Sequence, residues 1–120
     1  MPRLAPRPVA WWRLLPVLAA ALLAASAGAQ QPDAERARQL IHLVRQDCGA
    51  CHGLTLKGGL GPALTAQALR QWPLENLQAT ILDGRPATPM PPFRNILNEA
   101  EAAWIAGQLL AGFPAEVSSQ

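Results

Sequence analysis

The chain has 120 residues, half of them apolar, with two Cys, two His, two Met, twelve Pro and no Tyr, so it forms one small domain at most. The first 29 residues contain no Asp or Glu, whereas the 91 that follow carry seven Lys or Arg and eight Asp or Glu, a formal net charge of −1. This balance excludes the basic stripe that nucleic-acid binding needs, so we expect no nucleic-acid partner.

Residues 1–29 have the layout of a secretory signal peptide. Three arginines precede an apolar stretch at residues 14–25, which ends at the small-residue cleavage site Ala27-Gly28-Ala29. We expect export to the periplasm by the general secretory route, with residues 30–120 as the mature domain. The alternative is an uncleaved anchor over residues 9–29, which would hold the protein at a membrane.

The first element of the mature domain is predicted to be a helix that begins after Asp33. Asp33 is a good N-cap, and apolar residues recur with helical spacing from Ala37 to Val44. Cys48 lies on the same apolar stripe, so the helix delivers Cys48 to the core. Charged and polar side chains are expected outside, namely Arg36, Arg38, His42, Arg45 and Gln46. Beyond Cys48, Gly49 and Gly53 are expected to loosen the backbone.

The helix leads into Cys48-Gly49-Ala50-Cys51-His52, which has the C-x-x-C-H pattern of a c-type haem attachment site and contains both cysteines of the chain. The two thiols can form thioethers with the vinyl groups of one porphyrin, and His52 can turn toward the iron as the proximal ligand. We therefore predict one covalently bound haem c. A buried porphyrin would also add the apolar mass that a domain of this size lacks.

Other roles for Cys48 and Cys51 have weaker support. A disulfide across two intervening residues closes almost no loop and stabilises little. A thioredoxin-like redox pair needs a βαβ unit, and no segment has the pattern of a strand. A zinc site needs a fourth ligand, and the remaining candidate, His42, lies on the opposite side of the predicted helix.

Residues 54–64 are predicted to form a loop, because three glycines and Pro62 interrupt any regular element. The Pro62 carbonyl, ten residues after His52, can accept a hydrogen bond from the imidazole Nδ1–H. Such a bond would orient the ring and strengthen it as an iron ligand. An ordinary Gly-Pro turn explains the same two residues equally well.

Two helices are predicted between this loop and a proline-rich segment. A short helix is expected over residues 65–71. A longer helix opens at Pro73, has an apolar face from Leu74 to Ile81, and ends at Gly84, which suits a left-handed C-cap.

Met90 is predicted to be the second axial ligand of the iron. It is the only methionine after the leader, and it lies within residues 85–93, where prolines on both sides hold an extended loop. The thioether is a soft ligand that suits haem iron. One alternative is that Met90 only fills a gap in the core. Another is that His42 binds the iron, although the helical stripe turns His42 outward.

The last helix is predicted to begin at the N-cap Asn98, with Glu101 completing a capping box, and to end before Gly112. A stripe of small and apolar residues predicts a close contact with another helix, namely Ala100, Ala103, Trp104, Gly107 and Ala111. Residues 117–120 are expected to be a frayed tail. The chain as a whole is predicted to be all-α with long loops.

Together these features resemble the class I monohaem cytochromes c, and the resemblance covers nearly the whole mature domain. More narrowly, four segments are similar to the small periplasmic cytochromes of the NirC type, namely Asp47–Gly53, Leu54–Pro62, Gly84–Pro86 and Met90–Phe93. The resemblance implies that the N- and C-terminal helices cross over the haem. It also implies the roles of five residues: Cys48 and Cys51 as anchors, His52 and Met90 as axial ligands, and Pro62 as carbonyl partner of the imidazole.

The function expected from these ligands is that of a one-electron carrier and not of an enzyme. With His52 and Met90 both on the iron, no coordination position is open in either redox state. The resemblance implies a redox partner protein, with the denitrification nitrite reductase that carries haem c and haem d as the candidate acceptor, and we expect a monomer. An accessory role in haem d assembly is the alternative. A peroxidase or ligand-binding protein would require Met90 to be off the iron.

Overall fold

The structure, a computed structural model, describes residues 1–2 and 30–114. Almost all of the predicted signal peptide and the predicted frayed tail at residues 117–120 lie outside the described residues. Within the described ranges the regular structure is helical and no residue forms a strand, so the all-α prediction is confirmed. None of the helices in these ranges is long and apolar enough to span a membrane.

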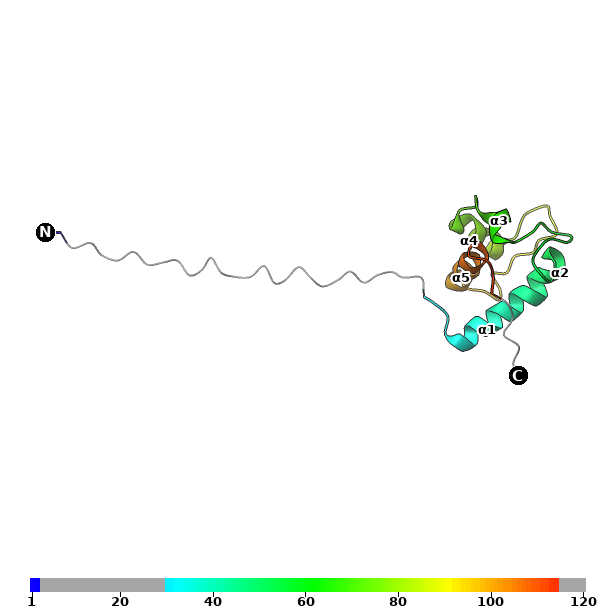
Figure 1. The fold of residues 1–120 in the computed structure, drawn as a ribbon, viewed down its shortest axis with the longest axis horizontal. Helices are drawn as coiled ribbons and strands as arrows, with labels where there is room; N and C mark the ends of the chain where they lie inside the picture. Colours follow the sequence, from blue (N-terminus) through cyan, green and yellow to red (C-terminus); the bar gives the residue numbers. More distant parts are fainter. Residues whose placement is uncertain (3–29, 115–120) are drawn as a thin grey trace.

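The helices follow one another along the chain as labelled in Figure 1. They are α1 (Ala34–Leu43), η2 (Val44–Cys48), α2 (Gly49–His52), α3 (Ala66–Leu69), α4 (Leu74–Asp83) and α5 (Glu99–Leu110). The first three run on without a break, and the prediction that Gly49 loosens the backbone is wrong: Gly49 is helical and buried. A Cβ at this position would lie 3.4 Å from the Leu54 backbone, which is an ordinary contact, so nothing in the structure requires a glycine here.

The predicted helix starts are confirmed by their capping bonds. The Asp33 side chain accepts a hydrogen bond of 2.8 Å from the Arg36 N–H. At the start of α5, Asn98 and Glu101 form the reciprocal capping box, with bonds of 2.9 and 3.0 Å. These bonds satisfy N–H groups that have no partner within the first turn of a helix.

The segment η2 is π-helical, a feature that the sequence pattern did not predict. A π-helical turn contains an extra residue, so the residues after Val44 do not keep the faces of an ideal α-helix. Arg45 is half-buried against Leu54, Phe113 and Pro114, and the prediction that it lies outside is wrong. Arg36 is also half-buried, because its Nε lies 2.6 Å from Glu101 Oε1 of α5. The other three polar side chains, Arg38, His42 and Gln46, are exposed as predicted.

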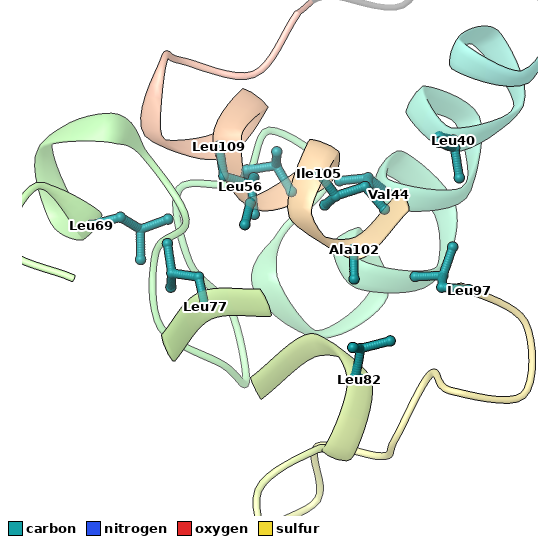
Figure 2. Close-up of a cluster of buried hydrophobic side chains, with 11 residues drawn as sticks. Leu40, Val44, Leu56, Leu69, Leu77, Leu82, Leu97, Ala102, Ile105 and Leu109 are labelled. Atoms are coloured by element: carbon teal, nitrogen blue, oxygen red, sulfur yellow. The ribbon is translucent and has the colours of Figure 1, made fainter. Parts of the chain in front are cut away.

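The core gathers aliphatic side chains from η2, α4, α5 and the loop after α2 (Figure 2). Its buried members are Leu40, Val44, Leu56, Leu69, Leu77, Leu82, Leu97, Ala102, Ile105, Ala106 and Leu109. All are aliphatic, and the described aromatic residues near the core, Phe93, Trp104 and Phe113, are only partly buried. An aliphatic core of this size is small for a stable domain, which leaves a role for a large apolar cofactor.

Helix α5 lies at the centre of the packing. It packs most extensively along α4, and Figure 2 shows Ile105 beside Val44 of η2. The buried face of α5 consists of Ala102, Ile105, Ala106 and Leu109. The stripe that starts at Ala100 lies on a different face of α5. The prediction that this stripe makes the main helix contact is therefore wrong: its members are half-buried or, at Ala111, exposed. Within this stripe, Trp104 packs against the core, and the Cβ position of Gly107 is 3.9 Å from Leu74 of α4.

Candidate functional site

The two cysteines of the C-x-x-C-H motif face different surroundings at the end of the first helical run. Cys48 is half-buried and packs against the core, whereas Cys51 is exposed, and both are free thiols. Burial, assisted by the Asp47 carboxylate, raises the pKa of the Cys48 thiol to about 11.

The loop after α2 closes the end of that helix. Gly53 ends the helix with a φ of 86°. The Gly58 N–H then donates to the His52 carbonyl, and the Gly61 N–H donates to the Cys51 carbonyl, both at 2.8 Å. These two carbonyls would otherwise lack partners at the helix end. The loop is thus fastened directly to the backbone of the motif.

Gly61 lies against the His52 ring so closely that no side chain fits there. A Cβ at this position would be 2.7 Å from Cε1 and 2.8 Å from Nδ1 of the imidazole. The prediction that the glycines make residues 54–64 a loop is confirmed. The structure adds that Gly61 packs on the ring face and limits its rotation, a role that a glycine count alone does not reveal.

The His52 ring is oriented by one hydrogen bond. Its Nδ1 lies 2.7 Å from the Pro62 carbonyl oxygen, so of the two interpretations of Gly61-Pro62 the hydrogen-bonded one is present in the structure. A carbonyl oxygen only accepts, so Nδ1 carries the hydrogen and Nε2 keeps its lone pair. The arrangement leaves Nε2 as the atom that can bind a metal.

Met90 lies half-buried in a loop whose start is closed on itself. Gly84 ends α4 with a φ of 68°, and the Arg85 N–H lies 3.3 Å from the Met90 carbonyl. A Cβ on Gly84 would come 2.7 Å from that carbonyl oxygen. The Thr88 hydroxyl donates to the Arg85 carbonyl at 2.7 Å. The prediction that residues 85–93 contain no helix or strand is confirmed, but the segment is not extended throughout, because a turn closes over residues 85–88.

The far end of the Met90 loop returns to the end of α4. The Phe93 N–H donates to the Ile81 carbonyl and the Arg94 N–H to the Leu82 carbonyl, both at 3.1 Å. The Arg94 guanidinium then binds the Asp83 carboxylate, with a shortest distance of 2.6 Å. Both ends of the loop are therefore attached at one helix terminus, and in Figure 1 this loop and the loop after α2 lie toward the α2 end of the molecule.

The residues that the motif and the loop after α2 bring together, Cys48, Cys51 and His52, fit a haem better than a bare metal ion. Among the described residues there is no group of three or more His, Cys, Asp or Glu side chains that could hold an ion. What the motif offers instead is two free thiols and an imidazole with an open Nε2. Leu54 and Leu60, in the loop beside the motif, are 68% and 95% exposed. His42 is exposed on α1, outside this loop.

Comparisons with known proteins agree with this site. Residues 35–107 match the family described as cytochrome c oxidase, cbb3-type, subunit III. The chain is 58% identical to cytochrome c55X of Pseudomonas aeruginosa over 69% of this chain and 70% of that protein. It is 55% identical to cytochrome c55X of Paracoccus denitrificans, over 74% of this chain and 86% of that protein.

Two solved structures are similar in fold and sequence. The c-type cytochrome NirC is 57% identical, with a TM-score of 0.65 over 67% of this chain and 94% of that chain. Dihydro-haem d1 dehydrogenase NirN, solved in complex with DHE, is 37% identical with a TM-score of 0.56, over 66% of this chain and only 17% of that chain.

The family match spans more than half of the chain, and the relatives of similar size are matched over most of their length. Cytochromes c carry their haem through a C-x-x-C-H motif, which this chain contains at Cys48 to His52. The chain therefore belongs to the cytochromes c, as a small all-α monohaem cytochrome of the NirC, or cytochrome c55X, type with covalently attached haem c.

Proposed function

We propose that this cytochrome is a periplasmic one-electron carrier in which Cys48 and Cys51 anchor the haem and His52 and Met90 ligate its iron. The observation that carries this proposal is the 2.7 Å contact between His52 Nδ1 and the Pro62 carbonyl, which leaves Nε2 free to bind iron. The bound haem supplies an iron that gains and loses one electron. With His52 and Met90 both as ligands, no coordination position of the iron would be open to a substrate, so we propose no enzymatic role.

The chain's own residues keep the ligands fixed during electron transfer. The Pro62 carbonyl and Gly61 hold the imidazole in one orientation, and the hydrogen bonds at the end of α4 hold the loop of Met90. A ligand set that does not rearrange keeps the structural cost of each electron transfer low. The exposed apolar residues Leu54 and Leu60, next to Cys51, form a surface suited to a short-lived contact with a redox protein.

The proposed acceptor is the nitrite reductase of denitrification that carries haem c and haem d. The support is the similarity to cytochromes of the NirC type, which occur alongside that enzyme. The proposed location is the periplasm, reached with the help of the leader at residues 1–29. Fractionation of cells, with mass analysis of the recovered chain, tests this: a chain that begins at Gln30 is expected, and a retained leader would indicate the membrane-anchored alternative.

A second candidate function is to accept electrons during the assembly of haem d. Its support is the similarity to dihydro-haem d1 dehydrogenase, seen both in the structure above and in 39% identity over 15% of the Pseudomonas aeruginosa enzyme. A dehydrogenase that oxidises a dihydro compound releases two electrons and two protons. A separate monohaem protein would take up those electrons one at a time.

Stopped-flow mixing distinguishes the two functions. Reduced cytochrome is mixed with oxidised nitrite reductase, and oxidised cytochrome with the dehydrogenase and its dihydro-haem substrate. Fast oxidation in the first mixture supports the donor role, and fast reduction in the second supports the assembly role. No transfer in either mixture at low salt would contradict both.

The docking surface is tested in the same experiment with a matched pair of variants. Leu60→Glu places a charge at the most exposed apolar side chain beside the motif, and we expect slower transfer with an unchanged visible spectrum. Ile96→Glu, at a side chain that is 53% exposed before α5, serves as the control and should leave the rate unchanged. Equal slowing by both variants would place the contact elsewhere.

A further inference from the structure

Arg45 of the π-helical segment η2 contacts both the loop after α2 and the end of the described chain, which lies 69 positions away. One guanidinium nitrogen, Nη2, donates to the Pro114 carbonyl at 2.7 Å, and the other, Nη1, donates to the Leu54 carbonyl at 3.3 Å. The guanidinium carbon also lies 5.3 Å from the centre of the Phe113 ring, within the range of a cation–π contact. The end of the described chain is thereby held against the loop that follows His52.

The charge of Arg45 is not neutralised by these contacts. Both acceptors are main-chain carbonyl oxygens, and the third contact is an aromatic ring. Its Nε is buried without a hydrogen-bond partner among the described residues. By contrast, the other arginines of the first helix, Arg36 and Arg38, each lie against a glutamate. A half-buried cation without a carboxylate is costly, so its position calls for a functional reason.

We propose that Arg45 is a positioning residue that clamps Phe113 and Pro114 onto the loop after α2 and that its charge, which no carboxylate among the described residues neutralises, raises the reduction potential of the haem. Arg45 lies three residues before Cys48 on the same helical run. A fixed positive charge favours the ferrous state, which carries one positive charge fewer than the ferric state. This inference requires the attached haem but neither a particular axial ligand nor a particular electron acceptor.

The expected size of the charge effect follows from Coulomb's law. At an effective dielectric constant of about 20, charges separated by roughly 10 to 20 Å change an equilibrium by roughly 4- to 15-fold. Arg45 precedes Cys48, the proposed first haem anchor, by three residues, so we expect an effect of this order. Loss of the charge should therefore shift the ferric-to-ferrous ratio, at a fixed applied potential, several-fold toward ferric.

The test is a redox titration of haem-loaded Arg45→Met, Arg45→Lys and the unaltered protein, followed optically. Arg45→Met removes the charge and the clamp, so its haem should be several-fold more oxidised at a fixed potential. Arg45→Lys keeps the charge but loses the two-pronged hydrogen bonding, so its potential should stay near that of the unaltered protein. If Arg45→Met yields no haem protein, Arg45→Gln takes its place, because its amide can still bond one carbonyl.

Arg38→Met is the matched control, because it removes the same charge from the same helix at an exposed side chain paired with Glu35. A reduction potential of Arg45→Met equal to that of Arg38→Met would overturn the electrostatic part of the proposal.

Hydrogen exchange tests the clamp: residues 111–113 should exchange faster in Arg45→Lys and in Phe113→Leu than in the control. Unchanged exchange in both variants would overturn the clamp. A failed electron transfer to nitrite reductase, with these shifts present, would leave this inference standing.

Discussion

A loop lies beside each candidate iron ligand: the first follows His52, the last residue of α2, and the second contains Met90. The two loops begin alike but hold their ligands differently. Each follows a helix that ends at a glycine with positive φ, Gly53 after α2 and Gly84 after α4, and each loop covers the carbonyl groups of its helix end. In the first loop the ligand side chain itself is held, since the His52 ring touches both the Pro62 carbonyl and Gly61. In the second loop the contacts that the structure shows for Met90 are those of its backbone.

This difference separates two ways of placing a ligand. The imidazole is oriented by a direct hydrogen bond and a close packing contact, so its direction is set by the protein alone. The thioether is brought to its place by closure of a loop, and its flexible side chain can adjust to what it binds. We therefore expect changes in the first loop to alter the ligand geometry, and changes in the second loop to alter stability or remove the ligand.

Met90→Ala is expected to produce the largest effect, because it removes the flexible ligand outright. The ferric iron–thioether charge-transfer band should disappear, the reduction potential should fall, and carbon monoxide or cyanide should bind readily. An optical titration with and without these ligands measures all three changes, with Ile96→Ala as a control outside both loops. If the visible spectrum of Met90→Ala is identical to that of the unaltered protein, Met90 is not a ligand. If the unaltered protein itself binds carbon monoxide or cyanide readily, a peroxidase or ligand-binding function is favoured instead.

Gly84→Ala should give the next largest effect, on stability. Gly84 combines a φ of 68° with a ψ of −166°, a conformation open almost only to glycine, and a Cβ there would lie 2.7 Å from the Met90 carbonyl oxygen. The atoms in the way belong to the backbone and cannot move aside, so we expect a loss of roughly 2 to 4 kcal/mol in the free energy of unfolding. Urea unfolding of the haem protein measures it. A loss below the expected range would show that the closure of the loop is not rigid.

Gly61→Ala should cost less stability but change the histidine side of the site. The new Cβ would be 2.7 Å from a side-chain ring, which can tilt at the expense of its bond to Pro62, so we expect a loss of roughly 1 to 3 kcal/mol. The spectrum of the haem protein should shift with the tilt. Gly107→Ala is the control, because its Cβ position has 3.9 Å of clearance within α5, and there the extra helix propensity should stabilise slightly. An unshifted spectrum in Gly61→Ala would contradict a ring held by packing.

Glu101→Gln should have the smallest effect, on the contact between α1 and α5 outside both loops. The Arg36 guanidinium, followed by the Asn98 N–H, lowers the pKa of the Glu101 carboxyl below its ordinary value of 4.5. A lowered folded-state pKa stabilises the fold above the unfolded-state value, and this stability is lost as the pH falls through the folded-state value. We expect Glu101→Gln to cost about 0.5 to 1 kcal/mol at pH 7 and less at pH 3.

Urea unfolding at the two pH values checks this expectation. Glu35→Gln, at an exposed carboxylate that Arg38 contacts within the same helix, is the control and should change little at either pH. A cost of Glu101→Gln that stays the same at both pH values would show that the carboxylate charge is not what joins α1 to α5.

Much of the fold was predictable because it depends on neighbours in sequence. Asp33 and Asn98 begin helices through bonds to residues three positions away, and Gly84 ends α4 by its own conformation. The haem motif is local in the same sense, since Cys48, Cys51 and His52 lie within one turn or so of helix. The Met90 loop was recognisable because prolines exclude regular structure on both sides of it.

Two of the predictions that failed concern the faces of helices and not their positions. The sequence pattern assumed a uniform turn of 3.6 residues, whereas η2 is π-helical and its Arg45 is half-buried. On α5 the small residues indicated one face, while packing along α4 buries the face of Ala102 and Ile105. Both outcomes depend on which partners a helix meets, and those partners are distant in sequence.

By itself the sequence determined the helix starts, the haem motif and the identity of the candidate ligands, because each rests on chemistry within a few residues. Only the tertiary structure decided that the His52 ring is held by Pro62 and Gly61, and that Arg45 meets Leu54 and Pro114. These contacts form only when segments up to 69 positions apart are brought together, since hydrogen bonds act over a few ångströms and leave no periodic pattern in the chain.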